Sequence, residues 1–94
     1  MNRMEKNYNY PLDMDWSHAE LMKVMALWQG VEKAYETGIS QADFMALYRE
    51  FKTVVKSIGE ERQLGREFEE ASGYSLYRVV QQAKNTSGKV KMQD

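Results

Sequence analysis

The feature that most constrains this chain is a serine that recurs just ahead of each stretch with helical spacing of apolar residues. In three of these places an acidic residue follows three positions later, which is the pattern of a capping box. In a capping box, each of the two side chains accepts a hydrogen bond from a backbone N–H that the helix start leaves free. The pairs are Ser17 with Glu20, Ser40 with Asp43 and Ser57 with Glu60, and Ser75 precedes the fourth stretch.

Apolar residues and glycines then predict where these helices run and end. The first stretch places apolar residues three and four positions apart, which is typical of one face of a helix. Gly38 and Gly73 stand where a left-handed residue commonly ends a helix. No stretch alternates apolar and polar residues in the manner of a strand. We therefore predict an all-α fold, a compact array of three to four helices with an extended N-terminal arm.

Composition limits the chain to one ordinary globular domain. Its 94 residues are too few for two domains, and 43% hydrophobic with 29% charged residues is not the composition of a disordered chain. The absence of cysteine excludes disulfides and thiolate metal sites. Apolar runs of at most five residues fall far short of the roughly twenty that a membrane span needs. We predict a cytoplasmic protein that does not contact a membrane.

Three segments are expected along the chain. Residues 1–15 form the N-terminal arm, which carries the only proline, Pro11. Residues before proline avoid the α region, so this part of the chain should be extended. Residues 16–85 form the helical domain. Residues 86–94 lack apolar periodicity and are predicted to be a flexible tail.

Pairs of carboxylates on one helix face are the only hint of chemistry. Glu32 with Glu36, and Glu67 with Glu70, have the spacing to hold a cation or to serve in acid–base catalysis. A solvated face with basic neighbours explains them more simply. The one histidine, His18, should be an exposed residue at the first helix start. No catalytic residue, metal ligand or cofactor site is predicted.

The segment 66–84 has the rhythm of a helix-turn-helix: a helix, a glycine turn, a serine and a second helix. Two features oppose that interpretation. Glu69 stands where the two helices would cross closely, and the first of these helices is acidic, so it would repel phosphates. We therefore do not expect nucleic acid to be the partner.

Aromatic residues near both ends of the domain suggest a surface for a partner protein. Tyrosine, tryptophan and arginine are enriched in interface hot spots. The candidate interaction surface comprises Tyr8, Tyr10, Tyr74, Tyr77 and Arg78. The competing interpretation is that the arm packs on the last helices and that the tyrosines bury one another.

An ordered series of short motifs also resembles a known family. The motifs are Tyr10-Pro11-Leu12-Asp13 and Asp15-Trp16, followed by the segments 31–38, 48–52 and 65–78. Over roughly residues 8–84 the chain resembles the YktA-like family of small uncharacterised bacterial proteins. The resemblance implies a compact helical domain without assigned activity, cofactor or partner, so no functional residue is carried over from it. Members often have a proline where this chain has Val55-Lys56-Ser57. The resemblance therefore does not determine at which residue the second helix ends.

The sequence favours a small non-enzymatic protein-interaction or regulatory module of unknown function. One alternative is a small-ligand or metal-binding enzyme that uses the helix-borne carboxylates. The other is a helix-turn-helix DNA binder through the 66–84 segment. The expected partner is a protein of unspecified identity, and the chain itself is expected to be a monomer or a weak homodimer.

Overall fold

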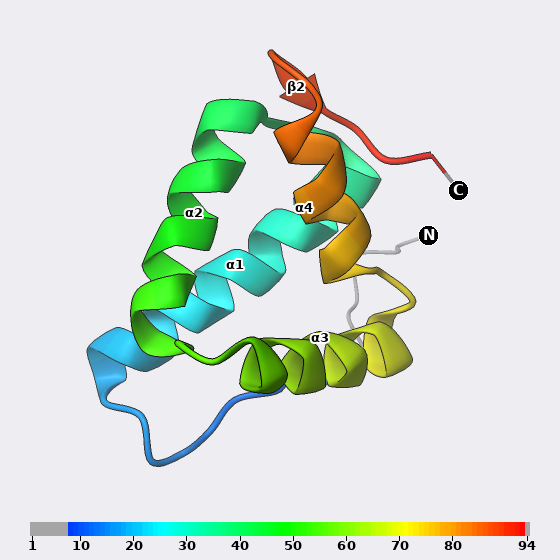
Figure 1. Ribbon diagram of the computed structural model, residues 1–94. Coiled ribbons are helices and arrows are strands. Elements are labelled where there is room, and N and C mark those ends of the chain that lie inside the picture. Colours follow the sequence, from blue (N-terminus) through cyan, green and yellow to red (C-terminus); the bar gives the residue numbers. More distant parts are fainter. Residues whose placement is uncertain (1–7, 94) are drawn as a thin grey trace.

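Four α-helices dominate the computed structural model, which describes residues 8–93 (Figure 1). The helices are α1 His18–Glu36, α2 Gln41–Val54, α3 Ile58–Ser72 and α4 Leu76–Lys84. Two short strands, β1 Ile39–Ser40 and β2 Lys89–Val90, complete the fold. The predicted all-α fold with an extended N-terminal arm is confirmed. Residues 1–7 of the predicted arm and Asp94 of the predicted tail lie outside the described residues.

The serines begin the helices as the sequence predicts. The Ser17 side chain accepts a hydrogen bond from the Glu20 backbone N–H (3.2 Å), and the Ser17 N–H donates to the Glu20 carboxylate (2.9 Å). Ser40, Ser57 and Ser75 each accept from the backbone N–H three residues later. The left-handed Gly73 (φ +84°) ends α3. The helix boundaries therefore follow from local hydrogen bonding.

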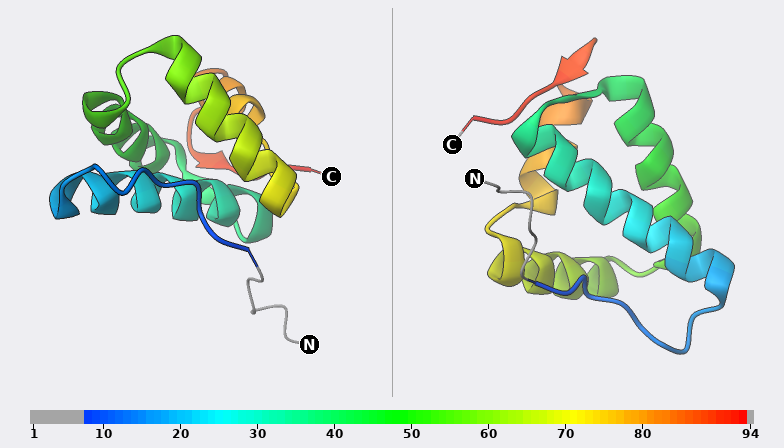
Figure 2. Two further views of the ribbon diagram at one scale, coloured as in Figure 1. Left: turned by 90° about the horizontal axis from the view of Figure 1, so that it is seen from below. Right: turned by 180° about the vertical axis from the view of Figure 1, so that it is seen from behind.

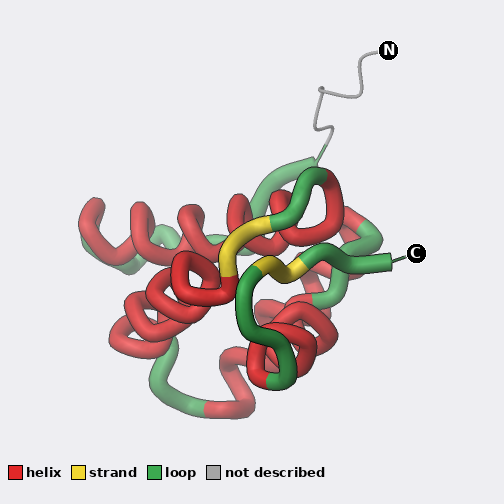
Figure 3. The backbone as a smooth tube through the Cα atoms, turned by 90° about the horizontal axis from the view of Figure 1, so that it is seen from above, coloured by secondary structure: helices red, strands yellow, loops and turns green. Residues whose placement is uncertain are grey.

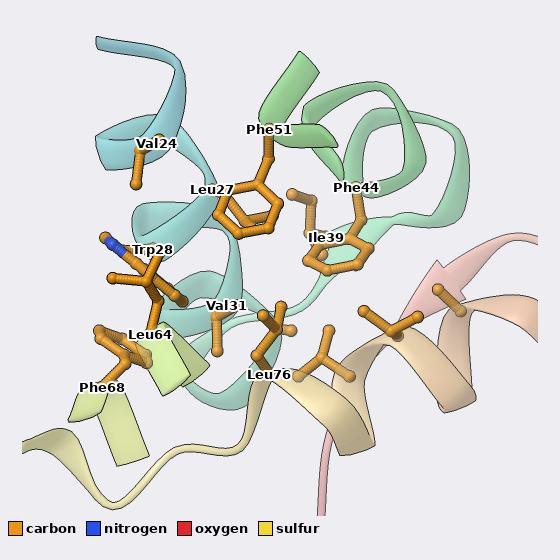
Figure 4. Close-up of a cluster of buried hydrophobic side chains, with 14 of the residues drawn as sticks. Val24, Leu27, Trp28, Val31, Ile39, Phe44, Phe51, Leu64, Phe68 and Leu76 are labelled. Atoms are coloured by element: carbon orange, nitrogen blue, oxygen red, sulfur yellow. The ribbon is translucent and has the colours of Figure 1, made fainter. Parts of the chain in front are cut away.

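Helices α2, α3 and α4 pack on the same side of α1, and the N-terminal arm leads from the start of α1 towards α3 (Figure 2). The centre of the core is Trp28 of α1, which is fully buried. Its ring stacks on Phe68 of α3 (centroids 4.6 Å apart) and meets the edge of Phe51 of α2 at 5.8 Å (Figure 4). One side chain thus ties three helices together.

The segment after α4 corrects a sequence prediction. We expected no packed structure after Asn85, and this is wrong for Lys89–Val90, which pairs antiparallel with β1 (Figure 3). Val90 is fully buried opposite Ile39. The Met92 N–H donates to the Ala34 carbonyl (2.9 Å). A two-residue strand is too short to show alternation, so its pairing with a distant partner was not visible in the sequence.

Candidate functional site

The two arm tyrosines are attached to a buried carboxylate of α1. The Tyr8 and Tyr10 hydroxyls donate to the two oxygens of Glu32, at 2.5 and 2.9 Å. Glu32 is only 5% exposed, so the prediction of a solvated carboxylate face is wrong at this position. Both tyrosine rings also contact Phe68 of α3. A buried carboxylate needs such donors, and the arm supplies them.

The titration of these tyrosines follows from their surroundings. Burial, together with the hydrogen bond to Glu32 and its negative charge, raises the pKa of Tyr10 to about 12. The same causes, in the same order, raise the pKa of Tyr8 well above its ordinary value. Both hydroxyls therefore stay protonated at neutral pH and act as hydrogen-bond donors. The two tyrosines therefore attach the arm to α1 through Glu32.

Tyr74 lies in the short connection between α3 and α4. Its ring stacks on Tyr35 of α1 with centroids 4.5 Å apart, and its hydroxyl donates to Glu36 (2.8 Å). The Tyr35 hydroxyl in turn accepts from the Ser75 backbone N–H (3.2 Å). Tyr74 therefore fixes the position of this connection on α1.

The structure does not bring the five residues of the predicted interaction surface together. Tyr8, Tyr10 and Tyr74 are half-buried and make the contacts just described. Tyr77 and Arg78 instead lie exposed on α4, and Tyr77 is 73% exposed. The part of the predicted surface that remains open to a partner is therefore on α4.

Tyr77 stands beside a groove of about 360 Å³ between α3 and α4. The groove also reaches Tyr48 of α2. Buried Leu76 and Val80 of α4 form part of its apolar lining, and Gly65 lies opposite them on α3. Ile58 also lines it and is 56% exposed. This groove, which the sequence analysis missed, is the candidate binding site.

Positive charge dominates the edges of the groove. Arg62, Arg66 and Lys84 line it and are exposed, whereas Glu69 is the one exposed carboxylate among its lining residues. The groove's other carboxylate, Glu61, is 8% exposed.

Glu61 is already partnered inside the protein. It accepts hydrogen bonds from the Tyr48 hydroxyl (2.6 Å) and the Lys52 ammonium (2.5 Å). Burial, the hydrogen bond from Tyr48 to Glu61 and the negative charge of Glu61 raise the pKa of Tyr48 well above its ordinary value. The charge of Glu61 is therefore neutralised by Lys52 and is not presented to a ligand.

Besides Tyr77, which its residue type singles out, the groove's signal in the sequence is Gly65, because a glycine within a helix is unfavourable and calls for a reason. Its position opposite Leu76 depends on how α3 and α4 pack. That packing could not be derived from helical spacing alone.

The remaining candidates for chemistry are dispersed. Glu67 and Glu70 are exposed on α3, and Glu67 accepts from the Gln63 side chain at 2.8 Å. His18 is exposed at the first residue of α1, as predicted. Within residues 8–93, no group of three or more potential ligand side chains is placed to hold a metal ion. No helix in this part of the chain is long and apolar enough to cross a membrane.

Fold and site together define a small helical domain with an open groove between α3 and α4. The chain belongs to the uncharacterised protein family UPF0223, whose family model matches residues 7–92. A family member from Enterococcus faecalis is 59% identical over 90 residues, which cover 95% of this chain and 98% of the relative. A member from Streptococcus gordonii is 55% identical over 83 residues, which cover 88% of this chain and 90% of the relative. A member from Bacillus mycoides is 46% identical over 82 residues, which cover 87% of this chain and 92% of the relative. The resemblance to a small uncharacterised bacterial family is thus confirmed, and the function of the family is unknown.

Proposed function

We propose that this protein is a small non-enzymatic protein-interaction module and that the groove between α3 and α4 is its binding face. One observation carries the proposal. Among the described residues, four large hydrophobic side chains are strongly exposed, and two of them, Tyr77 and Ile58, line the groove. The others, Met14 and Met22, lie on the arm and on α1. Exposed apolar side chains gathered around a concavity are typical of a surface that a partner covers.

The chemistry of the lining suits a protein partner. Tyr77 can bury its ring and still hydrogen-bond through its hydroxyl, which is why tyrosine is common at the centre of interfaces. The buried Leu76 and Val80 side chains provide a rigid apolar base, because they also belong to the core. Little ordering is needed in this protein when a partner binds, and preorganisation of this kind favours affinity.

The two other functions considered from the sequence lack comparable support. In the carboxylate enzyme, Glu32 would be a reacting group, but both of its oxygens accept hydrogen bonds from tyrosines. In the DNA binder, α4 would enter the major groove with α3 beside it. Glu67 and Glu70, which are exposed on α3 but do not line the groove, would then repel phosphates.

The proposal extends to the setting of the protein. We infer that it acts in the cytoplasm, as a monomer or a weak homodimer, with a protein partner. We also infer that the YktA-like family is this same family, because the residues that carry the resemblance all fall within the matched range 7–92.

Site-specific photo-crosslinking tests the proposal. A photoreactive phenylalanine analogue replaces Tyr77 in one variant and Met22, an exposed apolar residue away from the groove, in a matched control. Both variants are expressed in a bacterium that encodes a family member and are irradiated in living cells. We expect a discrete higher-mass adduct to a cellular protein from position 77 only. Equal adducts from both positions, or none from position 77, would contradict the groove as the binding face.

A further inference from the structure

We infer that the groove between α3 and α4 binds an acidic, amphipathic helical segment of a partner protein. The inference rests on the proposed function and adds the chemical class of the partner. Three observations carry it: the charge of the groove's edges, the shape of its lining, and a glycine that keeps the groove open.

The charge of the edges favours an acidic occupant. The exposed charged residues of the lining are three cations and one carboxylate. The cations are Arg62, Arg66 and Lys84, and the carboxylate is Glu69. Within residues 8–93, no ion pair joins these three cations to a carboxylate, and Glu61 is taken up by Lys52. A net positive rim on a protein whose overall net charge is −1 is a local feature and not a consequence of composition. Glutamate or aspartate side chains on the partner complement it.

The shape of the lining favours a helix. On α3 the lining positions run from Ile58 through Gly65 to Glu69, with one or two residues from each turn. That range corresponds to about 16 Å of helix at 1.5 Å per residue. On α4 the lining runs from Leu76 to Lys84. A surface that is apolar at its base and charged at its edges complements the amphipathic face of a helix, as in the helix-in-groove mode of peptide recognition.

Gly65 supplies an argument that does not depend on charge. A Cβ atom at this position would lie 3.7 Å from the nearest Leu76 carbon, which is an ordinary contact distance. Packing of α3 on α4 therefore does not require glycine here, although glycine weakens a helix. A side chain at this position would occupy the groove. We assign to Gly65 the role of leaving room for the partner.

Selection from a peptide library tests the inference on the full chain. The probe is a random library of peptides of about twelve residues, long enough for three helical turns. We expect the recovered peptides to combine glutamate or aspartate with leucine or aromatic residues at helical spacing. Their affinity should fall with increasing salt, because exposed charge pairs are screened.

Charge reversal then locates the binding site. In the double variant Arg62→Glu with Arg66→Glu, we expect the affinity of the recovered peptides to fall by about tenfold or more. The matched control, Arg49→Glu with Lys56→Glu, makes the same change in net charge at exposed positions that do not line the groove. This control should change the affinity by less than about twofold, since screening weakens distant charges. Circular dichroism melting curves establish that both variants are folded.

Several results would overturn the inference. Recovered peptides without acidic residues, or equal losses in the two double variants, would exclude an acidic partner in this groove. Binding of a single-stranded oligonucleotide with the same dependence on Arg62 and Arg66 would assign the groove to nucleic acid. A dimer in sedimentation that Tyr77→Glu abolishes would make a second copy the occupant. An adduct from position 77 in cells to a partner segment that is not acidic would contradict this inference alone and leave the proposed function standing.

Discussion

Two glycines in the middle of helices show how differently the two helix pairs of this protein pack. At Gly30 of α1, a Cβ atom would lie 2.7 Å from a Leu47 methyl carbon of α2 and 3.6 Å from the Phe44 ring. At Gly65 of α3, the nearest atom, a Leu76 carbon of α4, is 3.7 Å away. A side chain at the first glycine would have to displace the Leu47 methyl group, whereas one at the second would make an ordinary contact.

The difference separates a closed side of the molecule from an open one. The α1–α2 side is filled by close packing, and the β1–β2 pair covers its end. The α3–α4 side keeps a groove with exposed Tyr77 and Ile58. This contrast supports our proposal that the open side is the binding face.

The largest effect is expected at Trp28, the side chain that joins the two sides. Trp28→Ala should lower the free energy of unfolding by about 3–5 kcal/mol, because a cavity forms where three helices meet. Denaturant unfolding followed by circular dichroism measures this loss. As a control on the open side, Ile58→Ala should change stability by no more than about 0.5 kcal/mol, since this side chain is largely exposed. Comparable losses in both variants would abolish the distinction between the sides.

Overpacking of the closed side is expected to give the next largest effect. Gly30→Val places an isopropyl group against Leu47 and Phe44, so it should lower the free energy of unfolding by about 1–3 kcal/mol. The denaturation midpoint of the purified variant measures the change. A midpoint equal to that of the unaltered protein would mean that Leu47 can move aside without cost, and Gly30 would then need another explanation.

Removal of residues 86–94 should destabilise the closed side somewhat less. The deletion loses the burial of Val90, which contributes about 1.5–3 kcal/mol, but it also releases backbone that was ordered at some entropic cost. The expected net loss is about 1–2 kcal/mol, or several degrees in Tm. Val90→Ala in the full chain should reproduce part of the loss. An unchanged Tm would support the sequence-based prediction that residues 86–94 form a flexible tail.

The sequence was sufficient for those parts of the fold that depend on neighbours in the chain. Ser17 with Glu20 and the left-handed Gly73 could be predicted because a cap requires particular residues a few positions apart. The β1–β2 pair and the burial of Glu32 could not be predicted. Each depends on contacts between segments more than twenty residues apart, and neither a two-residue strand nor a single tyrosine produces a periodic pattern in the sequence.

The candidate site was predicted only in part, for the same reason. Tyr77 and Arg78 were singled out for their residue types, and the structure leaves both exposed. The other three tyrosines have the same side-chain chemistry, but they contact α1 or α3 of their own chain. These are Tyr8, Tyr10 and Tyr74. Residue type alone cannot distinguish a tyrosine that binds a partner from one that binds a carboxylate of its own chain.

A smaller effect is expected from alkaline pH at the arm. The folded protein raises the pKa of Tyr10 from 10.0 to about 12, so its protonated form stabilises the fold below about pH 10. That contribution is lost as the pH rises from about 10 to 12, when the hydroxyl can no longer donate to Glu32. The free energy of unfolding should therefore fall across this range, and less steeply in Tyr10→Phe. Equal slopes in the two proteins would show that the Glu32 contact does not hold the arm.

The central claim, that the groove between α3 and α4 exists for binding, is tested most directly by Gly65→Ala. Stability and affinity for the selected acidic peptides are measured on the same sample. The account predicts that the free energy of unfolding is unchanged or rises by up to about 1 kcal/mol, because alanine favours the helix and its methyl group fits beside Leu76. Peptide affinity should fall in the same variant, since the methyl group occupies the groove. A variant that is less stable but binds as well as before would show that Gly65 serves the packing of α3 on α4, and would contradict the account.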